Sequence, residues 1–176
     1  MKKTTFTFLI LIFTCLAKIY SQEGIYIYSI DLPGDITSGK HDNETLIKSF
    51  SKSTESSTTI AGGGGVFVGK AVSNGVTILK SYNKPSLTIK EKLYMGASIP
   101  KMEFRFYNNL NVMYYKITLG RVFVVNYLEN GEACPTGTCP GISEEIKFVF
   151  GSIKEEDLLL MTSECWSFIT NSAVCP

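Results

Sequence analysis

Few residues of this chain could do chemistry, and the first is its single histidine, His41. A Ser-His-Asp or Cys-His catalytic site would have to use this imidazole as its base. His41 stands in a polar stretch, residues 35–44, without a recognisable nucleophile motif. The sequence therefore predicts an exposed loop histidine. The neighbouring acids at 144–145 and 155–157 are interpreted in the same way, as solvated strand ends or loops rather than acid–base pairs.

A second candidate is the glycine-rich stretch 64–70, whose spacing fits the phosphate-binding loop G-x-x-x-x-G-K. That motif needs a Ser or Thr after the lysine to hold magnesium, and it opens a helix. Ala71 occupies the hydroxyl position, and residues 72–75 (VSNG) do not predict a helix. We interpret the match as chance. The sequence thus predicts no catalytic residue and no cofactor, and it does not support an enzyme.

The cysteines are the third group. After residue 21 the chain holds four of them: Cys134, Cys139, Cys165 and Cys175. An even number in an exported chain favours disulfides, and four cysteines allow three pairings. Short separations favour Cys134–Cys139 and Cys165–Cys175, each stabilising by at most about 3 kcal/mol. A four-thiolate zinc site is the alternative, but neither pair has C-x-x-C spacing and no histidine lies nearby.

Export itself is predicted from residues 1–21. Two lysines precede an uncharged, mostly apolar run, residues 4–17, and Ser21 provides a small residue before Gln22. This order is typical of a cleaved secretory signal peptide. Lys18 ends the apolar run before the about 20 residues that a membrane span needs. We expect cleavage between Ser21 and Gln22.

The alternatives to cleavage are an uncleaved anchor, a buried strand, or a lipoprotein acylated on Cys15, although residues 12–14 fit a lipobox poorly. Removal of 21 from 176 residues leaves 155, enough for one domain with a full core. The leader holds three of the 17 basic residues and none of the 16 acidic ones, so the mature chain has 14 against 16, a net charge of −2. The sequence lacks the dense Lys/Arg cluster that is typical of nucleic-acid binding. No segment after residue 21 is apolar enough to span a membrane.

The elements that would position these residues are mostly strands, because apolar and polar residues alternate along the chain. Residues 52–65, rich in Ser, Thr and Gly, are predicted to be a mobile loop. Together, the predicted strands and helix favour a mainly β fold, an antiparallel β-barrel or two-sheet sandwich with one flanking α-helix. Strands are predicted at residues 25–30, 46–51, 66–68, 76–79, 102–106, 112–119, 122–128 and 144–150.

One helix is predicted between residues 83 and 96. Asn83 or Ser86 can cap its start, and Gly96 can close it. Ile89 and Leu93, spaced i to i+4, would face the core.

Four stretches in collinear order resemble the haemolysin-coregulated protein (Hcp) family, the tube proteins of bacterial type VI secretion. Residues 25–51 (IYIYSIDLPGDITSGKHDNETLIKSFS) hold an opening strand, a histidine-containing loop and an S-F-S strand. Residues 84–100 (KPSLTIKEKLYMGASIP) hold a helix and an Ile-Pro turn. Residues 114–127 (YYKITLGRVFVVNY) resemble the family's Y-x-x-x-T-x-x-x-V-x-V strand pair, and residues 144–154 (EEIKFVFGSIK) its E-x-[IV]-x-[FL]-x-[FY] closing strand.

The resemblance implies a β-barrel of two sheets with one helix outside. It also implies that six copies form a ring, and that rings stack into a hollow tube whose lumen carries small effectors. Residues 52–65 match the place of the extended loop that the family uses in ring stacking, with a plain disordered loop as the alternative. The expected organisation is a signal peptide at 1–21, an Hcp-like barrel at 22–154 and a Cys-containing extension at 155–176.

The leader and the cysteines depart from the resemblance, because typical family members assemble in the cytosol. The leading hypothesis is therefore an exported Hcp-like structural protein, in the periplasm or the medium, that self-associates into hexameric rings. The alternative is a secreted monomeric binding module that keeps the fold without the tube and binds a secreted protein or a cell surface. An enzyme or toxin ranks third. No nucleic acid is expected as a partner.

Overall fold

The computed structural model describes residues 24–37, 39–60, 66–131 and 141–176, with the backbone alone at 57–60 and 66–68. These residues form strands, one α-helix and a short 3-10 helix. Their bounds are β1 Gly24–Tyr28, η1 Gly39–His41, β2 Glu44–Ile47, β3 Ser49–Ile60, β4 Val66–Ser81, α2 Ser86–Met95, β5 Ile99–Tyr107, β6 Met113–Gly131, β7 Ile142–Asp157 and β8 Thr162–Ser167. The predicted mainly β fold with a flanking helix is confirmed over the described residues.

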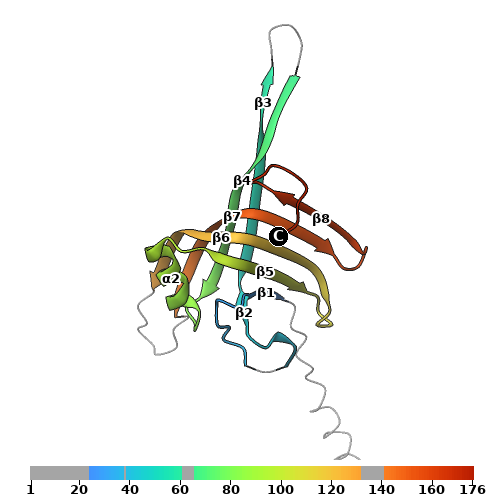
Figure 1. Cartoon of the computed structure of the whole chain (residues 1–176). Coiled ribbons are helices and arrows are strands. Elements are labelled where there is room, and N and C mark those ends of the chain that lie inside the picture. The colour runs from blue at the N-terminus through green and yellow to red at the C-terminus, as the bar shows by residue number, and fades with distance from the viewer. Residues whose placement is uncertain (1–23, 38, 61–65, 132–140) are drawn as a thin grey trace, which may run out of the picture.

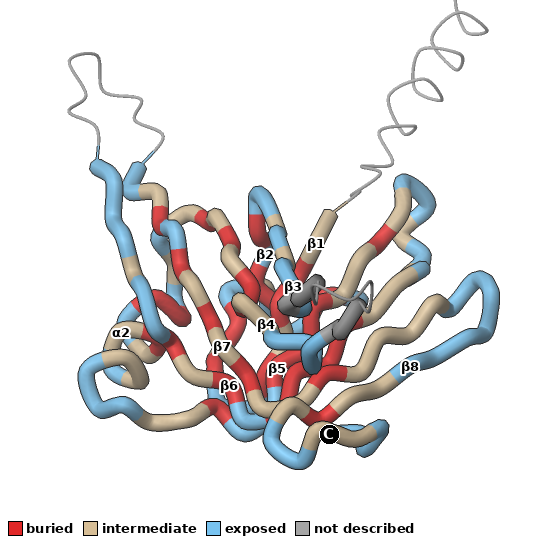
Figure 2. Tube along the Cα trace, turned by 90° about the horizontal axis from the view of Figure 1, so that it is seen from above, coloured by how far each residue is buried: buried red, intermediate tan, exposed pale blue. Residues whose placement is uncertain are grey.

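All the strands belong to one antiparallel sheet, in the order β2–β1–β5–β6–β7–β4–β3, with β8 also paired to β7. The two ends of this order are consecutive in the chain, because β2 passes into β3 through Lys48. The Lys48 amide donates to the Leu79 carbonyl (2.7 Å), so Lys48 already lies beside β4. One extended segment therefore pairs first with β1 and then with β4, and the sheet closes into a barrel (Figure 2).

The core fills this barrel from alternating strand positions. Met102 and Phe104 of β5 are fully buried, and Ile146 and Phe148 of β7 are fully buried in the same cluster. Full burial of a side chain of this size stabilises the fold by about 1.5–3 kcal/mol. The alternation seen in the sequence thus marks the inner face correctly. The cluster also includes Ile27, Ile47, Val76, Ile78, Ile89, Ile99, Ile117, Leu119, Val122, Val124, Phe150 and Ile153.

Helix α2 packs on the barrel beside β6 (Figure 1). Ile89 is buried and Leu93 is partly buried against the core, as predicted. Gly96 ends the helix at φ 59°, a left-handed conformation that glycine adopts at little cost. The predicted side-chain cap is wrong, because Pro85 occupies the N-cap position. The Ser86 hydroxyl instead turns inward and accepts a hydrogen bond from the Asn83 amide (2.9 Å).

The predicted loop at 52–65 is wrong for residues 52–60, which continue β3. They pair with β4, which joins the two short strands predicted at 66–68 and 76–79 into one. The hairpin, here called the β3–β4 arm, extends away from the barrel (Figure 1). The prediction failed because backbone pairing needs no apolar period, and Thr and Ser suit a strand exposed on both faces. Residues 61–65 lie outside the described residues.

Three further predicted boundaries change. The strands predicted at 112–119 and 122–128 form the single strand β6, with Arg121 at φ 51° as a local irregularity. Strand β7 continues past residue 150 to Asp157, and the chain then turns back as β8. The segment after residue 154 is therefore paired with the sheet rather than trailing from it. Asn108 forms the turn before β6, since its Oδ1 accepts hydrogen bonds from the amides of Leu110 and Val112 (both 3.0 Å).

Candidate functional site

His41 is buried (5% exposed), so the prediction of an exposed loop histidine is wrong. Its ring stacks on Tyr26 at a centroid distance of 4.1 Å and meets Tyr107 edge-on at 4.5 Å. Nδ1 lies 2.7 Å from Glu44 Oε2, and Nε2 lies 2.7 Å from Asn111 Oδ1. Both ring nitrogens are therefore occupied by contacts within the fold. This histidine fastens the loop before β2 to the turn before β6.

Glu44 links the histidine to a second charged group. Its Oε1 accepts a hydrogen bond from Arg105 Nη1 (2.6 Å), and Arg105 Nη2 also donates to Glu103 Oε2 (2.6 Å). Burial would raise the pKa of Glu103, but the hydrogen bonds and charges of Arg105 and Lys101 outweigh it and hold the pKa below its ordinary value. The arginine also lies over the Tyr28 ring at 4.0 Å. These contacts pair each acid with a cation, so neither buried carboxylate is left without a compensating charge.

A second buried network lies under α2. Lys80 and Glu144 form an ion pair with fully buried side chains, so the prediction of a solvated acid is wrong for Glu144, although Glu145 is exposed. Lys80 Nζ also donates to Ser86 Oγ (2.7 Å), and Ser86 Oγ donates to Glu144 Oε2 (2.9 Å). Burial lowers the pKa of Lys80, while Glu144 acts in the opposite direction. The network joins β4, β7 and the start of α2.

The acids at the end of β7 are also engaged. Glu155 pairs with Lys52 and accepts a hydrogen bond from Tyr115 (2.9 Å). Lys116 and Lys154 each lie 2.8 Å from Glu156 and, together, lower the pKa of that carboxyl. Glu155 and Glu156 are thus each paired with lysine side chains, rather than solvated as the sequence had suggested.

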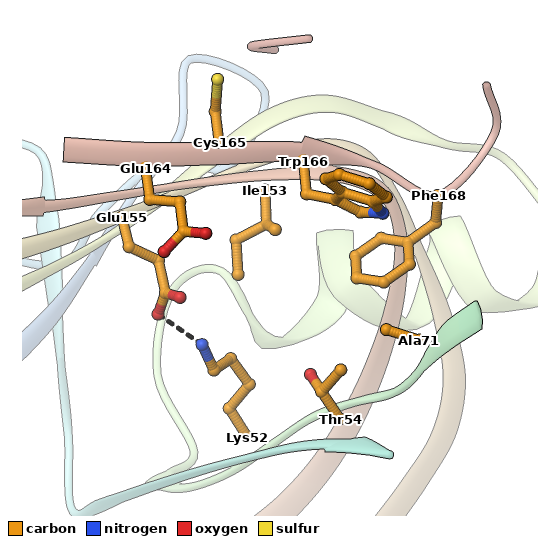
Figure 3. A pocket seen from close by; sticks show the side chains of 9 residues that line it. All are labelled: Lys52, Thr54, Ala71, Ile153, Glu155, Glu164, Cys165, Trp166 and Phe168. Atoms are coloured by element: carbon orange, nitrogen blue, oxygen red, sulfur yellow. Dashed lines mark hydrogen bonds and ion pairs between the residues drawn. The ribbon is translucent and has the colours of Figure 1, made fainter. Parts of the chain in front are cut away.

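A cleft of about 400 Å³ separates the β3–β4 arm from β8, and we call it the β8 cleft (Figure 3). Strand β4 pairs with β7 only along residues 76–81, whereas β8 pairs with β7 from Ser152 onward. The two hairpins therefore diverge from one strand and leave a wedge between them. The cleft is lined by Lys52, Thr54, Ala71, Ile153, Glu155, Glu164, Cys165, Trp166 and Phe168.

The walls of the cleft are apolar at one end and charged at the other. Ile153, Trp166 and Phe168 gather on the β7–β8 side, whereas the Lys52–Glu155 ion pair lies at the opposite end (Figure 3). The Trp166 indole Nε1 is buried without a hydrogen-bond partner. An apolar pocket with a few polar groups at its margin is typical of a ligand-binding site. The cleft is the candidate functional site, and the sequence could not reveal it because its walls come from segments about 100 residues apart.

The structure has a disulfide between Cys165 and Cys175, with Cα atoms 5.1 Å apart. Cys165 points away from the β8 cleft (Figure 3), so the bond ties the C-terminal tail to the other face of β8. The predicted Cys134–Cys139 pair lies outside the described residues. So do Ser21 and Gln22, at the predicted cleavage site.

The described part of the chain also bears on metal sites and membrane spans. It contains no cluster of three or more His, Cys, Asp or Glu side chains suited to a metal ion. It contains no helix long and apolar enough to cross a membrane. The described residues 66–70 of the phosphate-loop match lie within strand β4, which removes the helix that this motif requires.

The sequence and the fold both match known proteins. The family model described as "Type VI secretion system effector, Hcp" matches residues 22–156. A solved structure of a type six secretion system protein aligns with a TM-score of 0.74 at 21% identity, covering 86% of this chain and 99% of that one. Hcp1 from Salmonella typhimurium aligns with a TM-score of 0.72 at 17% identity, covering 86% and 98%. A further crystal structure of an Hcp protein gives 0.68 at 12% identity, covering 84% and 98%.

The comparison with curated proteins gave no match. At these identities the solved structures establish the fold alone, whereas the family match extends over most of the 176 residues. The chain therefore belongs to the Hcp family of type VI secretion system effectors.

Proposed function

We propose that this chain is an exported structural protein that self-associates into hexameric rings, as a type VI secretion tube subunit does, and that it has no catalytic site. The observation that carries the proposal is the family match over residues 22–156, together with the closed barrel. The polar groups that could do chemistry also support the absence of a catalytic site, because His41, Glu44 and Glu144 form hydrogen bonds or ion pairs within the fold.

Export to an oxidising space, periplasm or medium, is the second part of the proposal. The leader pattern at residues 1–21 supports the general secretory route. The Cys165–Cys175 bond supports an oxidising location, because disulfides persist mainly outside the cytosol. A protein sent out through the general secretory route would assemble apart from a tube that grows in the cytosol.

To test the proposal, the full chain is expressed in an exporting bacterial host and recovered from the periplasm and the medium. Light scattering on a non-reducing sizing column should give a six-copy mass. Mass spectrometry of the intact protein should give an N-terminus at Gln22. A strict monomer at every concentration would overturn the ring, and an intact Met1 in exported material would overturn cleavage.

The second candidate is a secreted monomeric binding module, and the β8 cleft is the observation that favours it. An apolar cleft of about 400 Å³ is within the range of sites that hold small ligands or side chains. A monomeric mass combined with saturable binding of a secreted protein would favour this candidate over the ring.

A further inference from the structure

The turn between β7 and β8 carries four consecutive apolar residues that are open to solvent. Leu159, Leu160 and Met161 are 67%, 72% and 92% exposed, and Leu158 is 36% exposed. We call residues 158–161 the apolar turn. Exposed apolar side chains that occur singly need no explanation, but a contiguous patch marks an interaction site.

Hydrogen bonds brace the backbone of the apolar turn. The Asp157 carboxylate accepts hydrogen bonds from the amides of Leu159 (3.0 Å) and Leu160 (2.9 Å). The Leu158 amide donates to the Tyr114 carbonyl (2.9 Å). Met161 is at φ 54°, a conformation that bulky side chains seldom adopt and that the surroundings must enforce. A turn fixed in this way presents its side chains with little ordering left to lose on binding.

The turn cannot reach the β8 cleft of its own chain. Trp166 lies five residues beyond Met161 along β8, and a strand advances about 3.3 Å per residue. The cleft wall is therefore of the order of 15 Å from the turn, along a straight hairpin whose turn points away from the β3–β4 arm (Figure 1). One molecule therefore carries both an exposed apolar turn and a cleft with apolar walls, and the hairpin holds the two apart.

We propose that the apolar turn of one copy docks into the β8 cleft of a second copy. The turn itself is uncharged, so its entry brings no charge into the cleft, and the apolar walls of Ile153, Trp166 and Phe168 match its leucines. The Lys52–Glu155 pair stays at the margin, which follows the apolar centre and polar rim of protein interfaces. The family model's match ends at residue 156, just before the apolar turn.

Such a contact joins two different surfaces, so each copy keeps a free turn on one side and a free cleft on the other. Head-to-tail contacts of this kind close into rings if the rotation permits and otherwise grow as filaments. This inference rests on the proposed self-association and identifies the apolar turn and the β8 cleft as the two surfaces in contact.

The test uses two single-surface variants and their mixture. The turn variant carries Leu159→Ser, Leu160→Ser and Met161→Ser, and the cleft variant carries Ala71→Trp, which fills the cleft from an exposed position of β4. Each variant should lose the wild-type oligomer and run as a monomer on a non-reducing sizing column. Their equimolar mixture should give a 1:1 dimer that does not grow, because one intact turn meets one intact cleft. Circular dichroism and the Cys165–Cys175 peptide mass verify that both variants fold.

A matched control carries Leu87→Ser and Met95→Ser on the exposed face of α2, and it should keep the wild-type mass. A turn variant that retains the wild-type oligomer would overturn the inference and leave the proposed ring intact. A mixture that stays monomeric would overturn it as well. A wild-type protein that is monomeric throughout would overturn the ring together with this contact.

Discussion

Lys80 and Glu144 form an ion pair with no exposed side-chain surface, 64 positions apart in the chain and directly under the start of α2. Removing one partner of such a pair leaves an uncompensated buried charge, which costs about 3–5 kcal/mol. Lys80→Met should therefore lower the free energy of unfolding by about that amount, measured by urea denaturation. The double variant Lys80→Met/Glu144→Gln should regain most of the loss, because no lone charge remains.

The control for this experiment is Lys90→Met, which removes the more exposed Lys90–Glu129 pair. Its effect should be much smaller than that of Lys80→Met. Equal losses for the two single variants would contradict the assignment of the Lys80 network as the anchor of α2.

Glu103 should make the fold sensitive to acid. Its pKa in the folded chain lies below its ordinary value, because the hydrogen bonds and charges of Arg105 and Lys101 outweigh the effect of burial. Folding then binds fewer protons at this site, so its contribution is present above the unfolded pKa of about 4.3 and is lost as the pH falls through the folded pKa. Denaturation midpoints measured from neutral pH down to about pH 3 should fall less steeply for Glu103→Gln than for wild type. The exposed Glu145→Gln serves as the matched substitution, and an identical effect of the two would exclude this role for Glu103.

His41 should matter for stability and not for any reaction. His41→Ala removes the stack on Tyr26 and leaves Glu44 and Asn111 each without one partner. A loss of about 2–3 kcal/mol in the free energy of unfolding is expected, since hydrogen bonds to charged groups contribute about 1.5–3 kcal/mol. Hydrogen exchange should rise first in the loop before β2. Unchanged exchange in that loop would show that the histidine does not fasten it.

The Cys165–Cys175 bond should stabilise β8 more than the barrel. The two cysteines are separated by 10 residues, and closing a loop of that size contributes about 2–3 kcal/mol in the chain-entropy model. The double variant Cys165→Ser/Cys175→Ser should speed amide exchange in β8 while β5 and β6 stay protected. Mass spectrometry of an unreduced digest should recover the linked peptide from wild type, and free thiols at both positions would contradict the bond.

Local pattern was enough to predict most of the strands and the helix. Ile89 and Leu93 share a helix face at any orientation of the helix, and Met102 and Phe104 share a strand face in any sheet, so their burial follows from spacing alone. The order of such segments also carries the family resemblance. The β3 residues 52–60 were missed because their pairing with β4 leaves no hydrophobic period in the sequence.

The sequence by itself thus determined the class of fold, its family and the expectation of export, since these depend on local periodicity, segment order and the leader pattern. Only the tertiary structure decided where the polar groups go. His41 and Glu144 stand in polar stretches of sequence, yet the fold buries them, because Tyr26 and Lys80 reach them from distant strands. The β8 cleft has the same origin: β4 leaves β7 where β8 joins it, and that divergence is a property of strand pairing that no single segment encodes.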